Sequence, residues 1–270
     1  MQNFSTPEQA ATWLHQRGAR RLHTDSRKVV AGDAFLAWPG ARHDGRRHIE
    51  SSLQRGAAAC LIEARGHQQA ASTALSQACA TYTDLKLSCG PIAAAYYEHP
   101  SQQMDLVALT GTNGKTTTVR LTAHLLRTHQ WRIGMTNTDG VYVNGHQTDS
   151  GDCSGPRSAR NVLMHPDADA AVFETARGGL LREGLAFDRC KVAVVTNLGG
   201  GDHLGLNYIS TVEDLAVLKR GIVQNVAESG TAVLNATDPM VAAMAGNCPG
   251  QVTFFGLDAH HPVIATHRAQ

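Results

Sequence analysis

The chain has 270 residues, of which 42% are hydrophobic and 17% are charged, and its formal net charge is +1. This length is enough for two domains that each bury a core. The near-neutral charge does not point to nucleic acid or an anionic membrane as a partner, and no apolar run approaches the roughly 18 residues that span a bilayer.

The beginning of the chain and its cysteines are typical of a cytoplasmic protein. Residues 1–9 have no basic start and no apolar stretch, so they do not form a secretion signal. Instead, Thr6, Pro7 and Gln9 predict a capped helix start. The six cysteines show neither the CxxC spacing of a zinc site nor the density of a disulfide framework. We therefore expect a cytoplasmic location.

A polar, proline-marked segment at residues 99–103 predicts a boundary between two domains, 1–100 and 101–270. In the first domain, strand-like runs and a short helix predict a small α/β fold, with strands at 34–38 and 57–62 and a helix at 73–80. In the second, short apolar runs alternate with helical patterns, which predicts a mostly parallel sheet covered on both faces. Its strands are expected at 106–110, 170–173, 192–196, 231–235 and 252–255.

Polar residues follow four of these predicted strands. Thr110 and Gly111 end the first, Glu174 follows the second, residues 197–203 follow the third, and Asn235 ends the fourth. In parallel α/β sheets ligands bind outside the carboxyl ends of the strands. We therefore expect the functional site at this edge.

Residues 110–117 read Thr-Gly-Thr-Asn-Gly-Lys-Thr-Thr, between a strand and a helix expected over 115–127. Glycines and a helix N-terminus let backbone N–H groups face a phosphate. The predicted nucleotide-binding residues of this P-loop are Gly111, Thr112, Asn113, Gly114, Lys115, Thr116 and Thr117. Lys115 is expected to reach the β- and γ-phosphates and Thr116 to hold Mg²⁺. The spacing is shorter than usual, since Leu109 stands at the usual first glycine; the alternative is a glycine turn with a surface lysine.

Lys219 falls in the middle of an apolar helical stripe. Residues 211–226 predict a helix capped by Thr211, with Asp214 three residues on. A lysine that faces a core tends to lose its charge, and a neutral amine can act as a nucleophile or accept CO₂ to form a carbamate. The alternative is a side chain that extends past the stripe to solvent.

Two further segments carry candidate metal ligands. Glu174 ends a strand and can offer oxygen to Mg²⁺, although an ion pair with Arg177 is an equal alternative. The glycine-rich segment 199–201 precedes Asp202 and His203, which predicts a close approach to a ligand, with His203 as a metal ligand and Asp202 orienting it. A lone loop histidine is more often structural, so this prediction depends on its neighbours.

The sequence of residues 110–117 closely resembles the signature of the Mur ligase family. The resemblance extends through Glu174, His203, Lys219 and residues 233–239. It implies that Glu174 and His203 bind Mg²⁺, that Lys219 is carbamylated, and that Asn235 and Asp238 lie near the nucleotide. Thr237 departs from the family pattern at this last motif.

The two predicted domains resemble different members of that family. Residues 24–35, 43–45 and 56–59 resemble the UDP-binding domain of the ligase that adds the third residue of the peptidoglycan stem peptide, with Ser26 as a candidate substrate contact. Residues 151–160, 174–184 and 202–205 are more similar to cyanophycin synthetase. Arg157 and Arg182 are candidates for acceptor recognition, because guanidinium groups pair with carboxylates; surface ion pairing is as good an explanation.

The resemblance implies an ATP- and Mg²⁺-dependent carboxylate–amine ligase that forms an acyl phosphate. Its partners would be an amino acid and a small-molecule or peptide acceptor, either cyanophycin-like or a UDP-muramyl peptide. We also expect the family's C-terminal domain to be absent from this chain. A P-loop kinase or NTPase switch is an alternative, but it would not need Lys219. A non-catalytic nucleotide-binding relative would not need the whole set of polar residues.

Overall fold

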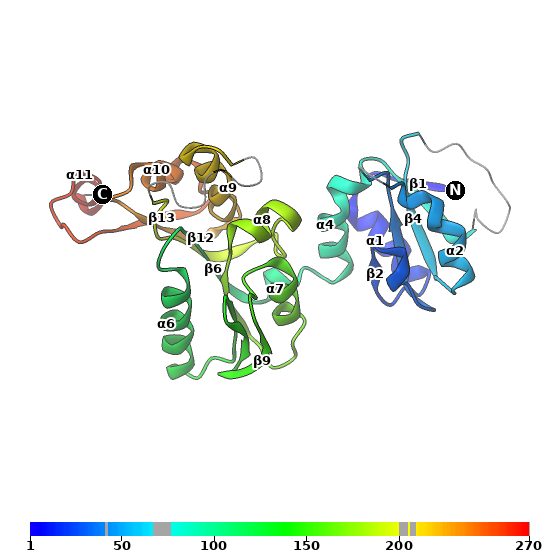
Figure 1. Ribbon diagram of the computed structural model, residues 1–270, viewed down its shortest axis with the longest axis horizontal. Coiled ribbons are helices and arrows are strands. Elements are labelled where there is room, and N and C mark those ends of the chain that lie inside the picture. The colour runs from blue at the N-terminus through cyan, green and yellow to red at the C-terminus, as the bar shows by residue number, and fades with distance from the viewer. Residues whose placement is uncertain (41–42, 67–76, 200–204, 206–208, 270) are drawn as a thin grey trace. The chain divides into compact units, whose positions relative to one another are not determined.

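A computed structural model describes residues 1–40, 43–66, 77–199, 205 and 209–269. The chain divides into two compact units, Met1–His99 and Pro100–Gln270 (Figure 1). Each unit has its own sheet and its own buried apolar core. Each is therefore described by itself.

The N-terminal unit is built on a five-stranded sheet in the order β1-β5-β4-β3-β2, in which all neighbouring strands are parallel. Apolar side chains of α1 and α4 pack on one face, and those of α2 pack on the other. The elements are β1 (Gln2–Phe4), α1 (Pro7–Gln16), β2 (Leu22–His23), η1 (Ser26–Lys28), β3 (Ala34–Ala37), η2 (Gly45–His48), α2 (Ile49–Gln54), β4 (Ala59–Glu63), β5 (Cys79–Tyr82) and α4 (Leu85–Tyr96).

Two sequence predictions for this unit have different outcomes. The helix start is confirmed: the Thr6 side chain accepts a hydrogen bond from the Gln9 N–H at 3.3 Å, while the Gln9 side chain accepts from the N–H of Ser5 rather than of Thr6. The helix expected over 73–80 is wrong at its end, because Cys79 and Ala80 belong to β5. That strand lies between β1 and β4, so its backbone pairs on both sides. Residues 73–76 lie outside the described part of the chain.

The second unit is built on an eight-stranded sheet in the order β13-β12-β11-β6-β10-β7-β8-β9. The strands are β6 (Asp105–Thr110), β7 (Ile133–Asn137), β8 (Gly140–Val143), β9 (His146–Ser150), β10 (Ala170–Glu174), β11 (Cys190–Val195), β12 (Val226–Asn235) and β13 (Gln251–Phe255). The helices are α5 (Pro100–Gln103), α6 (Lys115–Thr128), α7 (Pro156–Leu163), α8 (Arg177–Glu183), α9 (Val212–Gln224), α10 (Pro239–Ala242), η3 (Ala243–Asn247) and α11 (Pro262–Ala269).

The α/β fold class and the mostly parallel sheet are confirmed. Strands β7, β8 and β9 form antiparallel pairs that the sequence analysis did not foresee. The helix expected over 211–226 ends at Gln224, because Val226 begins β12 and pairs with Cys190. Thr211 and Asp214 form the predicted capping box.

Helices cover both faces of the larger sheet (Figure 1). Val119 and Ala123 of α6 pack on the face that carries Leu109 and Val172, and apolar residues of α7 and α9 pack on the opposite face. No helix in the described part of the chain is long and apolar enough to cross a membrane.

Candidate active site

The polar residues predicted to share one edge of the sheet do so where the structure describes them, and residues 200–203 of that set lie outside the described chain. Strands β11, β6 and β10 are adjacent and parallel, with Val195 opposite Thr110 and Glu174 opposite Leu109. Asn235 ends β12, the next strand outward. The carboxyl ends of four neighbouring strands therefore meet, as in other α/β ligand sites.

The loop between β6 and α6 needs its glycines for different reasons. Gly111 has φ +150°, and a Cβ there would lie 1.9 Å from Thr196 Oγ1. Gly114 has φ +82° and precedes the first residue of α6. Positive φ is a low-cost conformation only for glycine. The loop thus brings backbone N–H groups to a helix N-terminus, the arrangement that binds phosphate.

The segment after β11 holds this loop in place. Thr112 N–H donates to the Asn197 carbonyl at 2.9 Å, and Asn113 N–H donates to Asn197 Oδ1 at 3.0 Å. The Asn197 side chain donates back to the Asn113 carbonyl at 3.1 Å. The Asn197 side-chain amide thus both accepts from and donates to the Asn113 backbone, and these bonds fix the conformation of the loop.

Asn235 and Asp238 bind the segment after β11, which in turn holds the P-loop. Asn235 Nδ2 donates to the Thr196 carbonyl at 2.8 Å. One carboxylate oxygen of Asp238 accepts from Leu198 N–H at 2.8 Å, and the other caps α10. In this structure, both residues therefore fix the segment after β11, and their predicted nucleotide contacts stay predictions.

Three side-chain oxygens gather at the start of α6. Thr116 Oγ1 donates to Glu174 Oε2 at 2.8 Å and lies 3.2 Å from Thr138 Oγ1. Octahedral Mg²⁺ with ligands at about 2.1 Å places neighbouring ligand oxygens about 3 Å apart. Glu174 is only 2% exposed, and its Oε1 has no hydrogen-bond partner within the described chain. The oxygen spacing and the under-satisfied buried carboxyl group fit a Mg²⁺ site.

Lys219 is buried, as its place in the helical stripe predicts. Its side chain is 1% exposed, and its Nζ donates a hydrogen bond to the Gly111 carbonyl. Burial, together with the nearby charges of Lys115 and Arg177, lowers the pKa of Lys219 to about 7. Near neutral pH, a large fraction of this amine is therefore uncharged.

Lys115 bonds to a different carbonyl of the same loop. Its Nζ donates to the Thr112 carbonyl at 3.0 Å, across one turn of the loop, and its side chain is partly exposed. A lysine folded back over its own loop is available to a bound anion.

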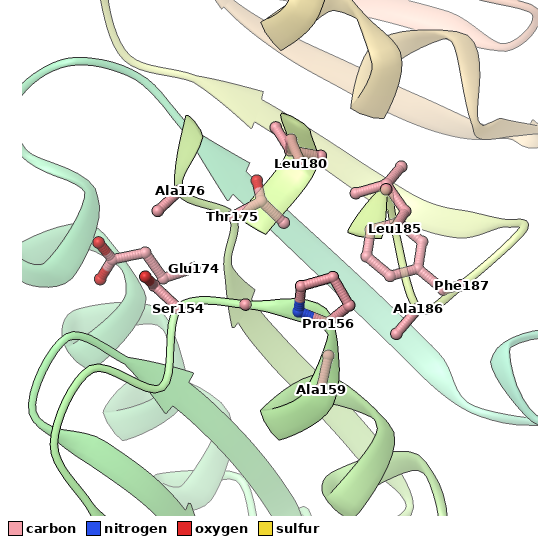
Figure 2. Close-up of a pocket in the computed structure, with 12 residues that line it drawn as sticks. Ser154, Pro156, Ala159, Glu174, Thr175, Ala176, Leu180, Leu185, Ala186 and Phe187 are labelled. Carbon is pink, nitrogen blue, oxygen red and sulfur yellow. The ribbon is translucent and has the colours of Figure 1, made fainter. Parts of the chain in front are cut away.

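A pocket opens beside Glu174 (Figure 2). Its polar side is formed by Ser154, Glu174 and Thr175, and its other walls are mainly apolar. Ser154 Oγ donates to Asp152 Oδ1 at 2.5 Å, and the Ser154 carbonyl accepts from Ala176 N–H. The segment before α7 is therefore bound to the end of β10. The remaining lining residues are Gly155, Pro156, Ala159, Ala176, Leu180, Gly184, Leu185, Ala186 and Phe187.

The other predicted site residues lie apart from this cluster. Arg157 is exposed on α7, and Arg182 is exposed on α8, with its guanidinium over Gly178. Neither lines the pocket beside Glu174. Asp202 and His203 lie outside the described residues, so their predicted roles stay predictions.

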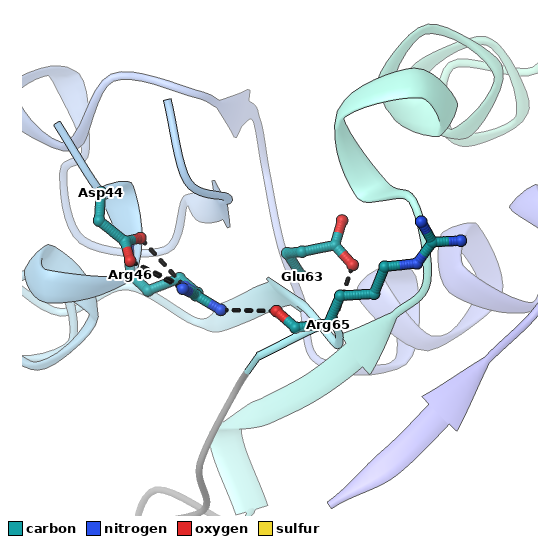
Figure 3. A network of polar contacts seen from close by, with 4 residues as sticks. All are labelled: Asp44, Arg46, Glu63 and Arg65. Carbon is teal, nitrogen blue, oxygen red and sulfur yellow. Dashed lines mark hydrogen bonds and ion pairs between the residues drawn. The ribbon is translucent and has the colours of Figure 1, made fainter. Parts of the chain in front are cut away.

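Ser26 belongs to the N-terminal unit. It begins η1, which Asp25 caps, and its carbonyl accepts from Arg55 at 2.6 Å. Nearby in sequence, Arg46 binds the Asp44 carboxylate and donates to the Arg65 carbonyl at 2.9 Å (Figure 3). The Arg46 guanidinium lowers the pKa of Asp44. These contacts order the segment that the sequence analysis associates with UDP binding.

Thr138 is a site residue that the sequence analysis missed. It follows β7, whose sequence Ile-Gly-Met-Thr-Asn is too short and too polar to stand out as a strand. The β10–β7 pairing brings this strand end beside Glu174. Recognition of β7 as a fifth strand ending at the same edge would have identified it.

Comparisons with known proteins agree with this geometry. The Mur ligase middle domain profile matches residues 109–270, more than half of the chain, and the profile of the Mur ligase family catalytic domain matches residues 19–86. The chain belongs to the Mur ligase family. The matched ranges include the P-loop, Glu174 and Lys219 in one case and Ser26 in the other.

Individual relatives divide between two kinds of Mur ligase. Over 165 residues, the chain is 49% identical to cyanophycin synthetase of Synechocystis sp., covering 61% of this chain and 19% of that protein. Over 249 residues it is 32% identical to the UDP-N-acetylmuramoyl-L-alanyl-D-glutamate--2,6-diaminopimelate ligase of Coxiella burnetii, covering 89% and 49%. The chain thus spans half or less of these relatives.

A solved structure supports the fold of this Mur ligase chain. The structure of a UDP-N-acetylmuramoyl-L-alanyl-D-glutamate--2,6-diaminopimelate ligase superposes with a TM-score of 0.67 at 23% identity, covering 90% of this chain and 49% of the other. At this identity, the likeness shows a shared fold and no more.

Proposed function

We propose that the protein is an ATP-dependent ligase that joins a carboxylate to the amine of an amino acid through an acyl phosphate. The observation that carries this proposal is the buried Lys219 bonded to the carbonyl of Gly111, in the same P-loop that leads to the Thr116–Glu174 pair. A simple phosphate-binding loop does not need a buried lysine, which is costly to bury.

ATP would be bound through the loop 111–116. Backbone N–H groups at the start of α6 face the phosphates, and Lys115 releases the Thr112 carbonyl to pair with them. A cation at Thr116, Thr138 and Glu174 would neutralise charge on the transferred phosphoryl group. Asn197, Asn235 and Asp238 support the loop from behind.

Lys219 would act as its carbamate. Its amine loses a proton near pH 7 and can then add CO₂ with release of a second proton, giving an anion in place of a buried cation. That anion offers oxygen to a second cation, with His203 as the further candidate ligand. The carbamate and His203, together with this cation, would orient the acceptor carboxylate toward the transferred phosphoryl group.

The acceptor would enter at the pocket beside Glu174 (Figure 2). A carboxylate oxygen of the acceptor would attack the γ-phosphorus of ATP, so that an acyl phosphate forms and ADP leaves. The amine would then attack the acyl carbon and lose a proton, which forms the amide and releases phosphate. The 49% identity with cyanophycin synthetase favours an amino-acid or peptide acceptor of that kind. Arg157 and Arg182 are candidates to hold its outer carboxylates. ATP supply for this chemistry agrees with a cytoplasmic location.

A UDP-muramyl peptide is the second candidate acceptor. It is favoured by the family match at residues 19–86, which contain Ser26 and the ordered Asp44–Arg46 segment (Figure 3). The two acceptors make different demands on the N-terminal unit, since only the second requires it to bind a uridine diphosphate group.

Two measurements test the proposal. Calorimetry with the chain measures ATP affinity with and without Mg²⁺, and UDP affinity in parallel. A phosphate-release screen of the protein pairs amino acids with aspartate-rich peptides or UDP-muramyl peptides, and mass spectrometry identifies the amide. Absence of ATP binding, or ATP hydrolysis without amide for every pair, would contradict a ligase. UDP binding together with muramyl-peptide turnover would favour the second acceptor.

A further inference from the structure

Asn137 carries a buried donor that nothing in the described chain satisfies. The residue is 0% exposed, and its Nδ2 has no hydrogen-bond partner among the described residues. Leaving a buried amide donor unpaired is costly, because the group loses its bonds to water and gains none in the protein. Such groups are rare in folded proteins and point to a missing partner.

The orientation of this amide is fixed by its other end. Asn137 Oδ1 accepts from Asp139 N–H at 2.8 Å and from Gly140 N–H at 3.1 Å, which closes the turn between β7 and β8. Both contacts are donors, so the amide cannot be rotated to place its nitrogen there. The donor therefore faces away from the turn.

The matching acceptor lies on the next strand. Glu174 Oε1 is also buried and has no hydrogen-bond partner among the residues that the structure describes. Thr136 pairs with Phe173 in parallel register, so the following residues, Asn137 and Glu174, stand side by side at the strand ends. Paired residues of neighbouring strands point to the same face. Ile133 and Val172 of these strands, at alternate positions, pack toward α6, which places both polar side chains on the α6 side.

We infer that Asn137 is a positioning residue for Glu174. Its amide N–H holds Oε1 through one buried water and leaves Oε2 at the cation site formed with Thr116 and Thr138. Groups that orient metal-binding side chains commonly affect metal affinity by 10- to 100-fold. The backbone carbonyl of Asn137 also accepts a hydrogen bond from Cys153 N–H at 3.0 Å, so the residue is bonded to the segment before α7, which lines the pocket beside Glu174.

This inference rests on the proposed function, and its test separates the two. Mn²⁺ replaces Mg²⁺, and electron paramagnetic resonance measures its binding to the chain loaded with ADP, with protein in excess over nucleotide. Asn137→Ala is expected to weaken Mn²⁺ binding by roughly 10-fold, while ADP affinity in EDTA changes less than about twofold. If the unaltered chain binds no ADP, the proposed function fails; if only the Mn²⁺ effect is missing, the inference alone fails.

Two further variants exclude a purely structural effect. Asn144→Ala is the matched control, because Asn144 caps the same hairpin through Ile133 N–H and the Asp167 carbonyl but lies at the opposite end of β7. It should leave Mn²⁺ affinity unchanged, and an equal loss would overturn the inference. In a Glu174→Ala background, Asn137→Ala should cause no further loss, because it acts through Glu174. If the losses of Mn²⁺ affinity from the two substitutions simply added, the inference would also be overturned.

Discussion

Lys219 Nζ donates a hydrogen bond to the carbonyl oxygen of Gly111, across 108 residues of sequence. The bond joins the middle of α9 to the first residue of the P-loop. Lys219 is buried, and Gly111 lies so close to Thr196 that a Cβ there would clash with its Oγ1, so both ends of the bond are closely packed. The charge state of one side chain is thereby linked to the shape of the proposed nucleotide site.

The pKa of Lys219 predicts a pH-dependent stability. Between about pH 7 and 10.5 the unfolded chain holds a proton that the folded chain lacks. Folded-state stability should therefore rise with pH in this window, by up to about 1.4 kcal/mol per unit. Lys219→Met removes this dependence. The gain in free energy of unfolding of the variant over the unaltered chain should therefore be largest at or below pH 7 and shrink above it. Urea unfolding in CO₂-free buffer measures this.

The control for that experiment is Lys191→Met. Lys191 is largely exposed and pairs with Asp105 at 2.8 Å, so its loss should shift the curve equally at all pH values. If the stability–pH curve of the Lys219→Met variant ran parallel to that of the unaltered chain, it would contradict the lowered pKa of Lys219.

Carbamylation of Lys219 predicts a specific ¹³C signal. Incubation of the chain with ¹³C-labelled bicarbonate at pH 8 should give a carbamate resonance, because most of this amine is then neutral. The signal should disappear in Lys219→Ala and persist in Lys191→Ala. Circular dichroism confirms that both variants are folded; the same resonance in folded Lys219→Ala would assign it to another amine.

Lys115→Ala should weaken ATP binding. The substitution removes a cation at the start of α6, and hydrogen bonds to charged groups contribute about 1.5–3 kcal/mol, or roughly 10- to 100-fold in affinity. Calorimetry with Mg²⁺ measures the loss, and thermal unfolding should hardly change, since Lys115 bonds to the Thr112 carbonyl of its own loop. Affinity equal to that of the unaltered chain would show that the loop is a structural turn.

Two glycine substitutions should have opposite effects. In Gly111→Ala the new Cβ would meet Thr196 Oγ1 at 1.9 Å at a positive φ, so we expect destabilisation and loss of ATP binding. In Gly221→Ala, nothing lies within 4 Å of the new Cβ inside α9, so a gain of about 0.5–1 kcal/mol is expected. Thermal unfolding and calorimetry measure both. A Gly111 variant that binds ATP normally would contradict the close packing of the loop.

Local patterns in the sequence were enough for the features that depend on neighbours along the chain. The Thr211 capping box, the P-loop between a strand and a helix, and the burial of Lys219 follow from residues one to four positions apart. The end of the helix at Gln224 does not follow from such neighbours, because Val226 pairs with Cys190 of β11. Strand pairing between distant segments overrides local helical preference.

The sequence alone therefore determined the fold class, the phosphate-binding loop and the side chains able to bind a cation, since periodicity and residue chemistry are local properties. Only the tertiary structure decided which of them meet. Thr138 and Asn137 lie beside Glu174 because β7 pairs with β10, although 37 residues of sequence separate Asn137 from Glu174. Sheet order is set by long-range packing, and a single sequence carries no direct record of it.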